Sequence, residues 1–138
     1  MTKSPKLYFS DTALAAYLLG IHDAEILIKG PSFGNLFETA VMADFFKRYL
    51  HHGQKPAVYF LRTADGLEVD GVLEAEQKLH LFEIKSVQTL QPKYAHPLSR
   101  WCEYIKDTRG VAGVIGAQDS VVPLSRGIKG IPWRALSR

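Results

Sequence analysis

Hydrophobic side chains recur at helical spacing in two parts of the chain and alternate with polar ones in shorter runs. Over residues 33–50 and 94–105 the apolar positions return every three to four residues, which predicts two amphipathic helices. Shorter runs rich in β-branched and aromatic residues, bounded by turn formers, predict strands. The expected strands are Val58 to Arg62, Leu67 to Leu73, Leu79 to Lys85 and Val111 to Ile115, with Ile131 to Leu136 as an optional fifth.

The first thirty residues read as a small helical entry segment. Ser10 or Asp11 can cap a short helix over residues 13–19, because both side chains accept hydrogen bonds from the first free backbone N–H groups of a helix. The apolar stretch Ile26 to Ile28 is short and is followed by Gly30 and a proline, so we expect a connection or a short strand there.

The order of these elements predicts an α/β fold. The helix at 33–50, three antiparallel strands, the helix at 94–105 and a further strand give the order α-β-β-β-α-β. We therefore expect an entry segment over 1–30 and one domain over 31–138. Its core would be a mixed sheet of about four to five strands flanked by helices.

The composition sets limits on the kind of protein. A chain of 138 residues, 46% of them hydrophobic, can bury one ordinary core. It has no run of about eighteen apolar residues and no secretory signal at its start, so we expect a cytoplasmic location and no membrane partner. Cys102 is the single cysteine and the histidines are scattered, which argues against a disulfide or a zinc site.

The charges are unevenly placed along the chain. Ten of the fourteen acidic residues lie between Asp23 and Glu83, whereas five basic residues and one acid lie between Arg109 and Arg138. An acidic centre beside a basic final third suits a protein that holds a polyanion near a bound cation. The alternative is an ordinary solvated surface.

Two carboxylates are expected to oppose each other in the hairpin. If the chain turns through residues 75–78, Asp70 lies directly across from Glu83, and Lys85 emerges on the same face. The strand over 79–85 is apolar on both faces, so it should be central and buried. Opposed like charges are destabilising unless positive charge lies between them, and unpaired buried charges cost several kcal/mol.

A third carboxylate, Glu38, belongs to the helix at 33–50. Apolar residues follow it at helical spacing, so a helix packed on the sheet by this face would carry Glu38 toward Asp70 and Glu83. Three converging carboxylates would suit Mg²⁺ or Mn²⁺. The alternative is a buried ion network without a metal, in which Glu68 pairs with Lys85.

These residues resemble the PD-(D/E)xK nuclease superfamily, although Val69 stands where the motif has proline. The resemblance implies a restriction endonuclease-like core, with Glu38 as the helical acid. It also implies that Asp70 and Glu83, helped by the main-chain carbonyl of Ile84, hold the metal, and that Lys85 orients or deprotonates the attacking water.

A closer resemblance covers nearly the whole chain. It rests on SPKLYFSDTALAAYLLG at 4–20, GNLFE at 34–38 and EVD at 68–70, which are similar to the C-terminal domain of unknown function in prokaryotic AAA-type ATPases. In that family an ATPase module precedes this region. The sequence has no G-x-x-x-x-G-K-[ST] loop, so we expect no ATP site in this chain and either a piece of a longer ATPase or a solitary domain.

Three functions remain open at this point, and enzyme activity is among them. The first is a Mg²⁺-dependent nuclease acting on DNA or RNA, and the second is a nucleic-acid-binding module that serves an ATPase. The third is a protein-interaction or oligomerisation domain, with Trp101 expected in the core and Trp133 in the core or an interface. The basic residues expected to bind nucleic acid are Lys93, Arg100, Arg109, Arg126, Lys129 and Arg134.

Overall fold

The computed structural model describes residues 6–64 and 66–137, and internal contacts divide the chain into two compact units. The first unit is Met1–Pro56 and the second is Ala57–Arg138. This division falls later in the chain than the expected end of the entry segment, whose limit at residue 30 stays a prediction. Within the described ranges, no helix combines the length and the hydropathy needed to cross a bilayer.

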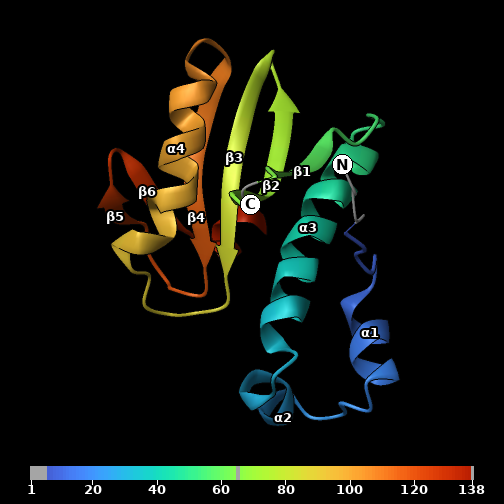
Figure 1. Ribbon diagram of the computed structural model, residues 1–138. Helices are drawn as coiled ribbons and strands as arrows, with labels where there is room; N and C mark the ends of the chain where they lie inside the picture. The colour runs from blue at the N-terminus through green and yellow to red at the C-terminus, as the bar shows by residue number, and fades with distance from the viewer. Residues whose placement is uncertain (1–5, 65, 138) are drawn as a thin grey trace. The chain divides into compact units, whose positions relative to one another are not determined.

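The first unit is helical. It contains α1 (Thr12–Leu18), α2 (Ala24–Lys29) and α3 (Phe33–His51), and Figure 1 shows α1 running beside α3. The helix predicted near residues 13–19 is confirmed. Its cap is Asp11, whose Oδ1 accepts hydrogen bonds from two backbone N–H groups of the first turn, at 2.8 and 3.1 Å.

The expectation of a connection or short strand at Ile26 to Ile28 is wrong, because this stretch lies within α2. Asp23 caps the helix by accepting hydrogen bonds from the first-turn N–H groups, at 2.8 and 3.1 Å. Glu25 and Lys29 then form an ion pair one turn apart. Capping and this pair favour helix more strongly than the β-branched isoleucines favour strand.

The second unit is built on a six-stranded mixed sheet with the strand order β1-β2-β3-β4-β6-β5 (Figure 1). The first three strands form the predicted antiparallel meander, whereas β3–β4 and β4–β6 are parallel pairs. The mixed sheet is thus confirmed. The bounds are β1 Val58–Arg62, β2 Glu68–Ala75, β3 Lys78–Lys85, η1 Pro92–Ala95, α4 His96–Tyr104, η2 Lys106–Thr108, β4 Arg109–Gly116, β5 Val122–Ser125, β6 Ile128–Pro132 and η3 Trp133–Ser137.

The β2–β3 hairpin has the predicted register. Glu74 pairs with Leu79, and the last paired residues at the far end of the ladder are Gly71 and Phe82. The turn consists of the two residues Glu76 and Gln77, both with positive φ, as a type I′ turn requires. Continuing this register by one position aligns Asp70 with Glu83.

One face of the sheet packs against α4. Leu98 and Cys102 of α4 belong to the same buried cluster as Leu81 of β3 and Val114 of β4. Strand β3 lies inside the sheet, and its four consecutive residues 81–84 are all buried. The prediction that this strand is central and covered on both faces is therefore confirmed.

The sheet has more strands than expected, and the predicted fifth strand is misplaced. Residues 133–137 form the 3-10 helix η3, and the loop predicted before them is the hairpin β5–β6. Its turn uses Arg126 and Gly127, both at positive φ. Pro123 concealed this hairpin in the sequence, but β5 is an edge strand, where a missing N–H breaks no ladder.

Candidate functional site: carboxylates and a lysine at the ends of β2 and β3

Asp70 lies where the ladder between β2 and β3 ends. Beyond the pair Gly71–Phe82, Oδ2 of Asp70 accepts a hydrogen bond of 2.9 Å from the main-chain N–H of Ile84. The carboxylate thus supplies the acceptor that a neighbouring strand otherwise provides. Because the N–H and carbonyl of one strand residue point to the same side, the carbonyl of Ile84 also faces the β2 side, where Asp70 lies.

Lys85 joins the two carboxylates. Its Nζ lies 2.6 Å from Oε1 of Glu83 and 3.8 Å from Oδ2 of Asp70. The carboxylate side chains are 9% and 10% exposed and that of Lys85 is 34% exposed, so the group reaches solvent through the lysine. This is the ion network that the metal-free alternative expects, while Glu68 lies 3.7 Å from Arg62 on β1.

The charge on Glu83 is poorly compensated. Burial raises the pKa of its carboxyl to about 7, with a further rise from the negative charge of Asp70, and Lys85 only partly offsets both effects. Oε2 of Glu83 is buried and has no hydrogen-bond partner among the described residues. Near neutral pH, either a bound proton or a nearby cation would therefore stabilise the buried carboxyl group of Glu83.

A hard divalent cation fits this donor set. The orphaned oxygen of Glu83, the carboxylate of Asp70 and the carbonyl of Ile84 are oxygen donors of the kind that Mg²⁺ and Mn²⁺ prefer. Within residues 6–64 and 66–137, no three or more His, Cys, Asp or Glu side chains gather as metal ligands. Two carboxylates are compatible with Mg²⁺, which usually keeps several waters.

Glu38 belongs to the first unit, where it has partners of its own. Its Oε1 accepts a hydrogen bond of 2.8 Å from the hydroxyl of Tyr8 and lies 2.7 Å from Nζ of Lys6. Burial, followed by the hydrogen bond to Glu38, raises the pKa of the Tyr8 hydroxyl. Val41 and Phe45, one and two turns along α3, are buried as expected, but the convergence of Glu38 with Asp70 and Glu83 stays a prediction.

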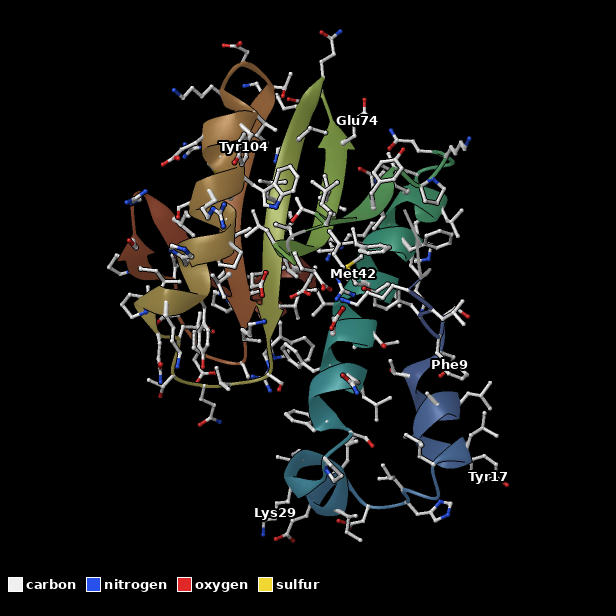
Figure 2. All side chains as sticks on the ribbon, viewed as in Figure 1. Phe9, Tyr17, Lys29, Met42, Glu74 and Tyr104 are labelled. Atoms are coloured by element: carbon white, nitrogen blue, oxygen red, sulfur yellow. The ribbon has the colours of Figure 1, made fainter. Side chains whose placement is uncertain are left out.

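The six basic residues proposed to bind nucleic acid are all exposed, but they lie at different edges of the second unit. Arg109 pairs with Leu79 at the start of β3, toward the end where Figure 2 labels the side chains of Glu74 and Tyr104. Arg134, in contrast, follows Pro132 at the other edge. Pro132 pairs with Gly116, which pairs with Lys85. Arg134 therefore lies at the C-terminal ends of the parallel strands, where the carboxylates also lie.

The remaining basic residues are spread over several elements. Lys93 lies on η1, 5.6 Å from the ring centre of Tyr94, and Arg126 at the β5–β6 turn pairs with Glu103 at 3.1 Å. Arg100 is on α4 and Lys129 is on β6. The six residues are thus not a single stripe.

The two tryptophans differ in burial. Trp101 is partly buried and packs against the buried cluster under α4, so its expected place at the core is confirmed in part. Trp133 is 37% exposed, and the guanidinium of Arg134 lies 5.0 Å from its ring centre. An exposed tryptophan beside an arginine offers a flat stacking surface near the edge where Lys85 lies.

Gln118 is a residue that sequence reasoning missed. It follows β4, is 8% exposed, and neither Oε1 nor Nε2 has a hydrogen-bond partner among the described residues. A glutamine after a predicted strand looks like an ordinary loop residue. Only the packing around it distinguishes Gln118 from the exposed glutamines.

Comparisons with known proteins give the family of the chain. An uncharacterized protein of Mycobacterium tuberculosis and one of Mycobacterium bovis are each 32% identical to it over 87 residues, which is 63% of this chain and 19% of each relative. The chain therefore spans about a fifth of the length of these curated relatives. No solved structure matches it. Residues 33–136 match the family described as "Domain of unknown function (DUF4143)", and because they are most of the sequence, the chain belongs to that family.

Proposed function

We propose that the second unit is a metal-dependent, PD-(D/E)xK-type nuclease domain that acts on nucleic acid phosphodiesters. The observation that carries this proposal is the buried Oε2 of Glu83, which has no hydrogen-bond partner among the described residues and lies beside Asp70 and Lys85. Lys85 faces these two carboxylates, which concentrate negative charge there when both are ionised. A divalent cation would neutralise this charge and would use Oε2 of Glu83, which has no hydrogen-bond partner among the described residues.

Each residue has a definite part in this proposal. Asp70, Glu83 and the carbonyl of Ile84 would hold Mg²⁺ or Mn²⁺. When bound, the cation supplies charge for a phosphate group and acidifies water. Lys85, the most exposed member, would contact the incoming phosphate or take a proton from the attacking water at Nζ.

The domain would work as part of a larger protein. Its curated relatives are about five times as long as the matched segment, which leaves room for other modules in them. Together with the resemblance to the C-terminal domain of AAA-type ATPases, this supports an ATPase partner module. The nucleotide chemistry would belong to that module.

The proposal is tested with cation binding and cleavage in parallel. Calorimetric titration with Mn²⁺ measures binding, and incubation with plasmid, single-stranded DNA and RNA in Mg²⁺ or Mn²⁺ measures cutting. Lys85→Ala should abolish cutting and keep Mn²⁺ binding. Glu83→Gln should weaken Mn²⁺ binding itself, because it removes the charge on a ligand.

Matched controls lie at the other end of the same hairpin. Lys78→Ala and Glu74→Gln change exposed residues of the same types on β3 and β2, and both variants should bind Mn²⁺ and cut like the unchanged protein. If the protein does not bind Mn²⁺, or if cutting survives Lys85→Ala, the nuclease proposal is wrong.

A second candidate is a nucleic-acid-binding module without cleavage. The exposure of the six basic residues proposed to bind nucleic acid favours it, because solvated cations are available to phosphates. This function predicts binding that weakens steeply as salt increases, by a logarithmic slope of about −0.9 for each phosphate neutralised on duplex DNA. Salt-independent binding, or none, would reject it and favour a protein-interaction role.

A further inference from the structure

Gln118 lies just beyond the C-terminal end of β4, at the end of the sheet where the parallel strands finish. It is two residues beyond Gly116, the last residue of β4. More than nine-tenths of its surface is buried, yet its amide group has no hydrogen-bond partner among the described residues. A buried amide in that state is destabilising, so a position that keeps one calls for a functional reason.

Two glycines make room for this amide. A Cβ atom at Gly116 would lie 2.9 Å from Leu90 and closer still to Oε1 of Gln118. A Cβ atom at Gly130 would lie 2.5 Å from Leu90 and 3.3 Å from Nε2 of Gln118. The amide therefore occupies space that side chains at both positions would otherwise fill.

The same space adjoins Lys85. Gly116 is the partner of Lys85 in the parallel ladder, and paired residues of neighbouring strands carry their side chains on the same face, about 4.8 Å apart. A side chain that lies where the Cβ of Gly116 would be is thus next to the base of the Lys85 side chain. Glu83, two residues earlier, points to this face as well.

The loops that follow β3 and β4 hold this arrangement together. The main-chain N–H of Ala117 donates a hydrogen bond of 2.9 Å to the carbonyl of Val87. This bond ties the residue before Gln118 to the segment that continues from Lys85. Leu90, from the same segment, covers both glycines. Gln118 is thus fixed relative to Lys85 by the backbone of both loops.

We propose that Gln118 is a further ligand-binding residue of the carboxylate and lysine site, and that its amide donates a hydrogen bond from Nε2 to a non-bridging phosphate oxygen of the nucleic acid. This inference rests on the proposed function. An amide suits the task because it adds a donor without adding charge; its Oε1 lies beside Gly116, the partner of Lys85, and its Nε2 lies toward Gly130. It also explains why the amide is kept without a hydrogen-bond partner among the residues that the structure describes.

The test replaces the amide by an apolar group of similar shape. Gln118→Met keeps an unbranched side chain, and Gln118→Leu is a second variant in case the first does not fold. Because the substitution removes no hydrogen bond to a described residue, thermal stability should stay the same or rise. Affinity for a short oligodeoxynucleotide in Mg²⁺, measured by fluorescence anisotropy, should fall by about tenfold, the value of one hydrogen bond to a charged group.

A direct readout complements the affinities. The side-chain NH₂ resonances of Gln118, assigned by their loss in Gln118→Met, should shift when Mg²⁺ and the oligodeoxynucleotide are added together. Gln77→Met at the exposed hairpin turn is the matched control, and its affinity should equal that of the unchanged protein.

The outcomes separate this inference from the function on which it rests. If the unchanged protein binds Mg²⁺ and oligodeoxynucleotide but Gln118→Met binds equally well, the role of Gln118 is wrong and the proposed function stands. If Gln118→Met unfolds more readily and its affinity is unchanged, the amide is structural. If the unchanged protein binds neither Mg²⁺ nor oligodeoxynucleotide, both proposals fail.

Discussion

The main-chain N–H of Ile84 donates its hydrogen bond to the side chain of Asp70, 14 residues earlier in the chain, at 2.9 Å. Both residues are buried, so this carboxylate is part of the sheet as well as part of the candidate site. Substitutions at Asp70 will therefore change stability and metal binding together. The two effects can be separated by choosing the replacement.

We expect Asp70→Ala to lower the free energy of unfolding by about 1–3 kcal/mol, because it leaves the buried N–H of Ile84 without an acceptor. Asp70→Asn keeps an oxygen that can accept this hydrogen bond, so it should lower the free energy of unfolding by less. Urea denaturation in EDTA measures both variants. Glu74→Ala, an exposed change on the same strand, is the control and should stay within about 0.5 kcal/mol. Equal losses in the alanine and asparagine variants would contradict the role of this hydrogen bond.

The hairpin that carries the site could be predicted because two signals agreed. The polar residues 75–78 placed the turn, and the pairing of Glu74 with Leu79 followed from that placement. Apolar residues on both faces of β3 indicated that the strand is buried. The conformation of the turn was harder to predict. Glu76 and Gln77 adopt positive φ without glycine or asparagine, so their sequence carries little sign of a tight turn.

The parts that sequence could not supply depend on contacts between distant residues. Tyr8 meets Glu38 from 30 positions away, and no local pattern indicates that partner. Gln118 becomes notable only because Gly116 and Gly130 lie on neighbouring strands and both lack a side chain. A residue whose importance comes from filling the space left by glycines on two other strands leaves no periodic signal in the sequence.

The raised pKa of Glu83 predicts an unusual dependence of stability on pH. The folded protein holds this proton up to about pH 7, whereas the unfolded chain releases it near the ordinary value of 4.5. The stabilising contribution is fully present below the unfolded value and is lost as pH rises through about 7. In EDTA, Glu83→Gln should therefore be more stable than the unchanged protein above pH 7, by on the order of 3 kcal/mol. Near pH 4.5 the two proteins should be equally stable.

Denaturant unfolding at a series of pH values checks this prediction. The relevant quantity is the difference in the free energy of unfolding between Glu83→Gln and the unchanged protein, because effects common to both proteins cancel in it. Glu74→Gln, at the exposed end of the same hairpin, should give a difference that does not vary over this range. A difference that grows as the pH falls from 7 toward 5 would refute the assignment of the raised pKa to Glu83.

Gly110 and His80 give a test of the sheet away from the site. A Cβ atom at Gly110 would lie 2.8 Å from two atoms of the His80 ring, and Nδ1 of that ring accepts a hydrogen bond of 3.2 Å from the N–H of Val111. Gly110→Ala must therefore displace the ring and break this bond. We expect a loss of about 1–3 kcal/mol in the free energy of unfolding, typical of an overpacked position.

The double variant decides whether the ring is the cause. With His80→Ala the obstacle is gone, so adding Gly110→Ala should then cost much less than it does alone, and the two losses should fail to add by about 0.5–3 kcal/mol. Chemical denaturation of the four proteins in the cycle gives this coupling. Additive losses would mean that the alanine strains the start of β4 by itself, because a backbone effect would persist whether or not the His80 ring is present.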